Sequence, residues 1–185
     1  MKVVANSSVL IGLSSIGRLA LLHERFPGGV LIPRAVWKEV VEEGGERPGA
    51  REVAGANWIA VCDVTAWEVV QLLEMELEKG EAEAIALAHE VGAEVVLLDE
   101  RDARRAAKRL GLHVLGTIGI LIWARRVGKL PSLRGALDAL QTRAKFRISR
   151  TLYERALGEV GEGEDERHCH PCPKSEQGVG AVGER

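Results

Sequence analysis

The sequence predicts an α/β domain with a mostly parallel central sheet of about five strands, followed by C-terminal helices. Short apolar, β-branched runs alternate along the chain with longer segments of helical periodicity, which is typical of parallel strands joined by crossover helices. The 185 residues, 46% of them apolar, suffice for one well-buried domain. We therefore expect a single domain at residues 1–157 and a tail at residues 158–185.

The first half of the chain is expected to hold three strand–helix units. Each strand is a short apolar run, and each helix begins at residues that favour a helix N-terminus. Asn6-Ser7-Ser8 cap the first helix, Pro33 starts the second, and Thr65 caps the third. The expected strand and helix ranges are 2–5 with 9–26, 30–32 with 34–43, and 58–64 with 65–79, and a loop with a Pro-Gly turn fills 44–55.

The second half adds two strands and further helices. Gly80 separates two helices, Gly92 and Gly111 end two others, and Thr117 caps an apolar helix. The expected ranges are helix 81–91, strand 94–99, helix 100–110, strand 113–115 and helices 118–127, 133–145 and 149–157. From residue 158 the chain is rich in Gly and Glu without periodicity, so we expect disorder there.

Four polar residues are predicted to share one edge of this sheet. In a parallel α/β sheet, the carboxyl ends of the strands and the starts of the following helices lie at the same edge. Asn6 follows the first strand and Asp99 ends the fourth, while Glu39 lies early in the second helix and Glu81 opens the helix before the fourth strand. We therefore expect these four side chains on a common rim.

Helical periodicity predicts that Glu81 points inward, whereas Glu83 and Glu90 point outward. An inward carboxylate is costly unless it is paired or binds a cation. The alternative for Glu81 is that it caps its own helix, where the helix dipole favours negative charge. Glu39 lies at the margin of an apolar stripe, and its alternative is an ordinary solvated helix face.

Three carboxylates that meet on one rim imply a bound cation. At a separation of about 4 Å and an effective dielectric of about 20, each pair repels by roughly 4 kcal/mol. Oxygen ligands without His or Cys favour Mg²⁺ or Mn²⁺. One or two such ions activate a water and stabilise the leaving oxygen in phosphodiester hydrolysis, which is the chemistry we infer.

Positive charge is concentrated after the acidic half. Residues 1–100 carry 8 Lys/Arg against 17 Asp/Glu, and residues 101–157 carry 14 against 3. This division suits a metal site beside a polyanion-binding surface, and the alternative is that the two halves mix in space. Basic residues at helical spacing form a stripe in the second half, and we expect this stripe to bind a nucleic-acid backbone. The alternative for the stripe is an ordinary solvated helix face. Its members are Arg101, Arg104, Arg105, Lys108 and Arg109, and Arg125, Arg126, Lys129, Arg143, Lys145, Arg147 and Arg150 add to the positive field.

Several segments together resemble a known family. They are VVANSSVLIGLSSIGRLALL, VLIPRAVWKEVV, GEAEAIALA, VVLLDERDARRAAKRLGL and VLGTIGILIWARRVGKL, which cover roughly residues 3–130. In combination they resemble PIN-domain proteins of the prokaryotic group related to VapC-type toxin ribonucleases. The resemblance implies a three-layer sandwich and a Mg- or Mn-dependent endoribonuclease for single-stranded RNA. It also implies a protein that is commonly dimeric and often neutralised by a small antitoxin.

By position, the resemblance assigns the catalytic and metal-binding roles to Asn6, Glu39, Glu81 and Asp99, with Ser8 as the hydroxyl that supports the first. The family usually has Asp where this chain has Asn6. An amide offers a carbonyl oxygen but no charge, so we expect weaker metal binding. The alternative is a degenerate PIN domain that binds RNA or a protein partner without catalysis. Asp102 could replace the missing ligand, but we favour its pairing with neighbouring arginines.

The remaining features exclude other classes. No apolar run reaches membrane-spanning length and no signal peptide is evident, so we expect a cytoplasmic protein. An odd set of three cysteines is no disulfide framework. The His168–Cys172 element packs four soft ligands too closely to surround one zinc ion, which favours adventitious binding. A phosphorelay receiver would need an acidic pair after the first strand and a lysine after the fifth, and the sequence supplies neither.

Overall fold

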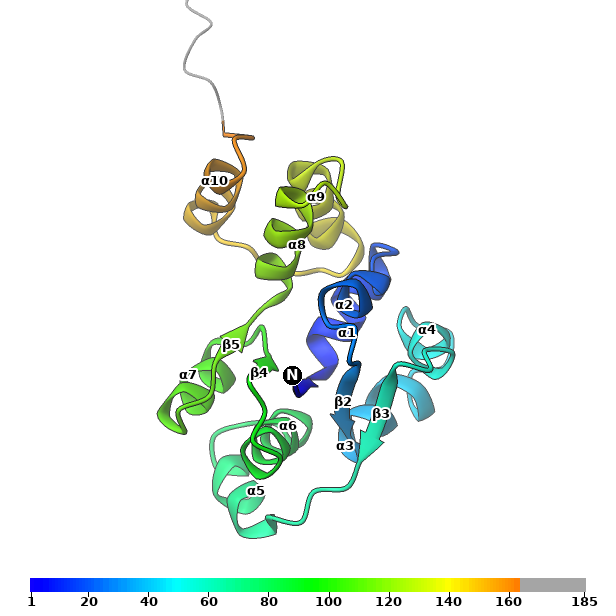
Figure 1. Ribbon diagram of the computed structural model, residues 1–185, viewed down its shortest axis with the longest axis vertical. Coiled ribbons are helices and arrows are strands. Elements are labelled where there is room, and N and C mark those ends of the chain that lie inside the picture. Colours follow the sequence, from blue (N-terminus) through cyan, green and yellow to red (C-terminus); the bar gives the residue numbers. More distant parts are fainter. Residues whose placement is uncertain (164–185) are drawn as a thin grey trace, which may run out of the picture.

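The computed structural model of the chain describes residues 1–163 and contains a five-stranded, all-parallel sheet in the order β3-β2-β1-β4-β5 (Figure 1). The strands are β1 (Val3–Ala5), β2 (Val30–Pro33), β3 (Ile59–Cys62), β4 (Val95–Leu97) and β5 (Val114–Leu115). In the central strand, Val4 pairs with Leu31 of β2 and with Val96 of β4. The predicted α/β class with about five strands is confirmed.

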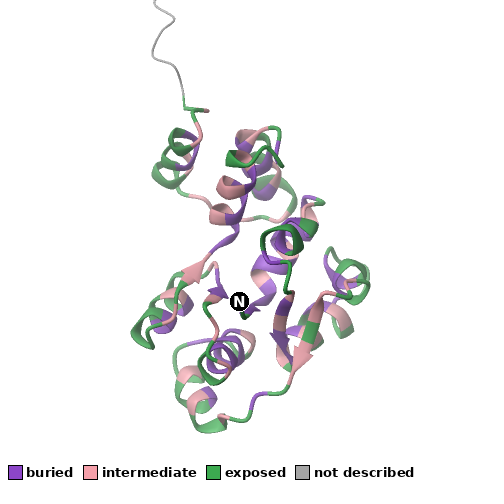
Figure 2. Cartoon of the chain, in the orientation of Figure 1, coloured by how far each residue is buried: buried purple, intermediate pink, exposed green. Residues whose placement is uncertain are grey.

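Helices cover both faces of the sheet and form an apolar core with each face. Successive side chains of β1 point to opposite faces, so they alternate between these two cores. Val3 and Ala5 belong to one core and Val4 to the other. The first core is shared by α1 (Ser7–Ser15), α2 (Ala20–Arg25), α8 (Thr117–Arg126), α9 (Leu133–Arg143) and α10 (Arg150–Glu159), and the second by α5 (Trp67–Glu74), α6 (Lys79–Glu90) and α7 (Arg101–Arg109). In Figure 2 the chain is coloured by burial, and buried residues in purple alternate with exposed residues in green along the helices.

Three helical segments differ from the prediction. The helix expected at 9–26 is divided into α1 and α2, because Gly17 adopts a φ of 66° between them. The helix expected at 34–43 begins as α3 (Arg34–Trp37) and continues as a π-helix, η1 (Lys38–Glu42). The expected loop at 44–55 contains a short helix, α4 (Ala50–Ala54), whose first turn is held by Glu52 Oε2 accepting from Gly49 N at 3.0 Å.

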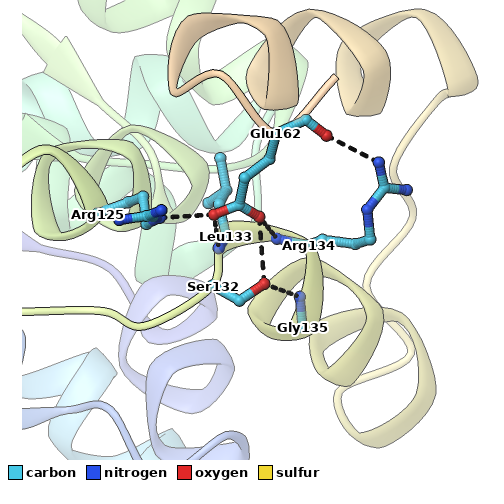
Figure 3. A network of polar contacts seen from close by, with 6 residues as sticks. All are labelled: Arg125, Ser132, Leu133, Arg134, Gly135 and Glu162. Carbon is cyan, nitrogen blue, oxygen red and sulfur yellow. Dashed lines mark hydrogen bonds and ion pairs between the residues drawn. The ribbon is translucent and has the colours of Figure 1, made fainter. Parts of the chain in front are cut away.

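Polar contacts with the rest of the domain continue beyond residue 157, because Glu162 is bound to residues of α8 and at the start of α9 (Figure 3). Its carboxylate accepts from Arg125 Nε at 2.6 Å, which joins the end of α10 to α8. It also accepts from three groups at the start of α9: the Leu133 and Arg134 backbone N–H groups and the Ser132 hydroxyl. The disorder expected for the rest of the tail, and the His168–Cys172 element, lie outside the described residues.

The order of the strands fixes where a site can form. The chain leaves β1 towards β2 on one side and later returns to β4 on the other, so β1 and β4 flank the switch point of the sheet. Ligands bind open α/β sheets at the carboxyl ends of strands at such a point. Asn6 and Leu97 mark this position, since Asn6 N donates to Leu97 O at 3.1 Å. Within residues 1–163, no helix is both long and apolar enough to cross a bilayer.

Candidate active site

A pocket of about 620 Å³ opens at the carboxyl ends of β1 and β4. Its wall is drawn from α1, η1, the start of α6, the β4–α7 connection and the linker between α9 and α10. The structure brings the four residues predicted for the rim together in this wall: Asn6, Glu39, Glu81 and Asp99. Ser8 lines it as well, whereas Asp102 does not.

Asn6 is the N-cap of α1 and is 4% exposed. Its Oδ1 accepts from Ser7 N at 2.7 Å, and the Ser7 hydroxyl donates to Glu39 Oε2 at 2.5 Å. Ser7 therefore connects the end of β1 to η1, a role the sequence did not reveal within a run of three capping residues. The Ser8 hydroxyl, expected to support Asn6, is buried and has no hydrogen-bond partner among residues 1–163.

Glu39 lies in the π-helical turn, a conformation that is rare and often found at functional sites. The backbone of Gly80 approaches it closely from the start of α6. A Cβ atom at position 80 would lie 3.2 Å from Glu39 Oε2, 3.5 Å from Ser7 Oγ and 3.6 Å from Asn6 Oδ1. Three oxygen atoms therefore converge on space that the absence of a side chain at Gly80 leaves open.

Glu81 is buried in the pocket wall, as its inward position on the helical wheel predicted. Its Oε2 also accepts from Glu78 N at 3.3 Å, so the capping alternative holds at the same time. Burial raises the pKa of Glu81, the backbone hydrogen bond opposes this, and the nearby carboxylates of Glu78, Glu100 and Asp102 add to the rise. The site therefore disfavours negative charge on Glu81.

The prediction that Glu83 points outward is wrong. Glu83 is only 3% exposed, its Oε2 accepts from Ala35 N at 3.0 Å, and Lys79 Nζ lies 4.0 Å from its Oε1. The helical-wheel argument fails because α6 is packed on several sides, by α3, α5, α7 and the sheet. Glu90 is exposed as predicted and binds the N–H and hydroxyl of Thr65.

Asp99 is held by Thr117 at the start of α8. Its Oδ1 accepts from Thr117 N at 2.8 Å and its Oδ2 accepts from Thr117 Oγ1 at 2.6 Å. Burial raises the pKa of Asp99, while these hydrogen bonds and the charge of Arg104 oppose the rise. Gly116 makes room for this arrangement, since a Cβ there would lie 2.9 Å from Asp99 Oδ1.

The predicted basic stripe on α7 is only partly free. Arg104 turns inward and donates to Leu98 O at 2.9 Å, and Arg109 pairs with Glu76 at 3.6 Å. Arg105 pairs with Asp102 at 2.5 Å, the interaction favoured for Asp102. Two members of the stripe are exposed and have no ion-pair partner within residues 1–163: Arg101 and Lys108.

The donor set of the pocket fits a hard divalent cation by its chemistry. Every candidate ligand offers oxygen, and the Ser8 hydroxyl is a buried polar group without a partner in the described chain. The carboxylates do not, however, form a closed cage. In residues 1–163, no three His, Cys, Asp or Glu side chains are grouped closely enough to hold a metal. The oxygens that converge most closely are those of Asn6, Ser7 and Glu39 around Gly80.

Comparison with known families agrees with the fold. A family model described as a PIN domain matches residues 2–162, and the chain therefore belongs to the PIN-domain family. PIN domains are generally nucleases and typically use divalent metals. No curated protein matches the chain.

Proposed function

We propose that this PIN-domain protein is a metal-dependent endoribonuclease that hydrolyses phosphodiester bonds in single-stranded RNA. The observation that carries the proposal is the convergence of Asn6, Glu39, Glu81 and Asp99 on one pocket at the switch point of the sheet. These residues come from four separate segments. Their shared position in the wall of one pocket supports a phosphodiesterase metal site, which needs oxygen ligands of this kind.

In this proposal the four residues hold Mg²⁺ or Mn²⁺, and the ion, when bound, supplies a nucleophilic water and stabilises the leaving oxygen. Ser7 fixes the orientation of Glu39 through its hydroxyl, and Thr117 fixes that of Asp99 through two hydrogen bonds. Asn6 contributes an uncharged oxygen beside Gly80. The exposed cations bind the phosphates of the strand.

The test is cleavage of a single-stranded RNA by the full chain with Mg²⁺ or Mn²⁺, compared with the reaction in EDTA. We expect metal-dependent internal cleavage that Asp99→Asn abolishes. Asp63→Asn is the matched control, because Asp63 is exposed, pairs with Arg34 and lies outside the pocket wall. Unchanged cleavage by Asp99→Asn would show that the site is assigned wrongly.

A second candidate function is binding of RNA or a protein partner without catalysis. It is favoured by the neutral Asn6 and by the lack of a three-carboxylate cluster among residues 1–163. The variant Asn6→Asp separates the two functions. If the wild type binds RNA without cutting it and Asn6→Asp cuts it, binding alone is the native function.

We further propose that the protein is a cytoplasmic toxin of a toxin–antitoxin pair, neutralised by a small partner and able to form a homodimer. Large apolar side chains on and beside α5 support an interaction of this kind: Trp67 is 50% exposed, Leu72 68% and Met75 81%. Light scattering of the purified chain tests the dimer. Growth arrest on expression, relieved by a protein encoded next to it, tests the toxin role.

A further inference from the structure

The linker between α9 and α10 forms one wall of the acidic pocket, although it lies far along the chain from Asn6. Lys145, Phe146 and Arg147 line the same cavity as Asn6 and Asp99. Phe146 is half-buried against the apolar core, and its N–H donates to Leu140 O at 3.2 Å. Phe146 therefore anchors the linker, and the two cations beside it are held in the pocket wall.

Lys145 occupies a conformation that its residue type rarely adopts. Its φ is 52°, the only positive φ of a non-glycine residue in the described chain. This left-handed conformation reverses the chain at the end of α9, where glycine is usual, and costs roughly 1–2 kcal/mol for a residue with a Cβ. Strained residues of this kind cluster at active sites and ligand-binding segments.

Three cations that line the pocket form no ion pairs with its carboxylates in the part of the chain that the structure describes. Arg101, Lys145 and Arg147 are exposed, and none has an ion-pair or hydrogen-bond partner through its side chain within residues 1–163. Glu39, Glu81 and Asp99 instead face hydroxyl and backbone donors. The pocket is therefore lined both by carboxylates and by three cations that these carboxylates do not neutralise.

We propose that Lys145 and Arg147 form a phosphate-binding arm. Together with Arg101, this arm binds the phosphates of a single RNA strand next to the acidic residues of the pocket. The inference rests on the RNA substrate of the proposed function but not on its cleavage. The two cations stand one residue apart on a linker anchored by Phe146, so they can contact neighbouring phosphates of a flexible strand.

The experiment measures binding of a fluorescently labelled single-stranded RNA to the full chain by anisotropy, in EDTA so that no cleavage occurs. The test variant is Lys145→Asn combined with Arg147→Gln, because asparagine tolerates the left-handed backbone. The control is Arg18→Gln combined with Arg155→Gln, which removes equal charge from residues outside the pocket wall. Thermal unfolding of each variant verifies the fold, and Lys145→Gly, which relieves the strain, is a second test variant.

We expect the arm variant to bind at least tenfold more weakly at moderate salt, and the control to change less than twofold. The dependence of log K on log salt should fall by about 1.4, because each lost phosphate contact on a single strand contributes about 0.7. Equal losses in the two variants, or no loss in the arm variant, would overturn the arm. So would a wild-type chain that binds no RNA.

The outcomes separate the arm from the nuclease. If RNA binding depends on the arm but the wild type never cuts RNA with Mg²⁺ or Mn²⁺, the arm proposal stands and the nuclease proposal is wrong. If the arm variant cuts RNA with an unchanged KM, the nuclease proposal stands and the arm proposal is wrong.

Discussion

The carboxylate of Asp99 is bound at both of its oxygens by one residue, Thr117, through the backbone N–H and the hydroxyl. The interaction joins the end of β4 to the first turn of α8 and places a negative charge at the N-terminus of a ten-residue helix, where the dipole favours it. Asp99 is therefore both a structural cap and a member of the pocket wall. The two roles can be separated by mutation.

Replacing Thr117 by Val removes the hydroxyl and keeps the shape of the side chain. Because Thr117 is fully buried and its hydroxyl donates to a charged group, we expect a loss of about 1–3 kcal/mol in the free energy of unfolding, measured with urea. The control is Thr142→Val, whose exposed hydroxyl binds only helix carbonyls and whose loss should cost less than about 0.5 kcal/mol. Equal stabilities of the two variants would contradict this account.

Ser7 and Ser8 form a matched pair, since they are adjacent and only Ser7 has a hydrogen bond through its hydroxyl in the described chain. We expect Ser7→Ala to lower the unfolding free energy by about 1–2 kcal/mol and RNA cleavage by about tenfold, because Glu39 loses the donor that orients it. Ser8→Ala should leave the stability within about 0.5 kcal/mol of the wild type. A larger stability loss from Ser8→Ala would reverse the assignment of the supporting hydroxyl.

Substitution of Gly80 tests whether RNA cleavage needs the oxygen-lined space beside this residue. In Gly80→Ala, the added Cβ meets Glu39 Oε2 at 3.2 Å and occupies that space. We expect cleavage to fall more than tenfold, while stability stays near the wild-type value because alanine favours the helix by about 1 kcal/mol. Gly158→Ala in α10 is the control, since nothing lies within 4 Å of its Cβ. It should gain stability and keep full cleavage.

Glu162 predicts a pH dependence at the other end of the domain. Burial opposes its charge, but hydrogen bonds from the Arg134 and Leu133 N–H groups and from the Arg125 and Ser132 side chains together outweigh burial and lower the pKa of Glu162 to about 2, from 4.5. A lowered folded-state pKa stabilises the fold above pH 4.5, and this contribution is lost as the pH falls towards 2. We expect Glu162→Gln to be less stable than the wild type at pH 7, with a difference that shrinks below pH 4.5. Urea unfolding from pH 7 to pH 3 measures it, and exposed Glu154→Gln is the control.

The sequence predicted the sheet and the meeting of Asn6, Glu39, Glu81 and Asp99 because both follow from connectivity. Parallel strands place their carboxyl ends at one edge whatever the side chains around them. The orientation of Glu83 could not be predicted in this way, since it depends on the backbone of Ala35 packed against α6.

The hydrogen bond from Ser7 to Glu39 and the position of the α9–α10 linker in the pocket wall were also not predicted. Both join segments far apart in the chain, and no local pattern reports such contacts. The helix break at Gly17 was not predicted although it is local. Its φ of 66° ends a helix inside an apolar-periodic run, where periodicity alone predicted continuation.

Glu81 gives the sharpest test of a metal role, because its environment disfavours the charge that a metal needs. Its raised pKa means that ionised Glu81 destabilises the folded protein, and the penalty appears as the pH rises above 4.5. In EDTA at pH 7, we therefore expect Glu81→Gln to be more stable than the wild type and inactive in RNA cleavage. Its amide oxygen can still accept from Glu78 N, so the cap is retained. Saturating Mn²⁺ should raise the thermal unfolding temperature of the wild type but not that of Glu81→Gln. Equal stabilisation of both proteins by Mn²⁺ would place the cation elsewhere, and a destabilised Glu81→Gln would assign the carboxylate a structural role alone.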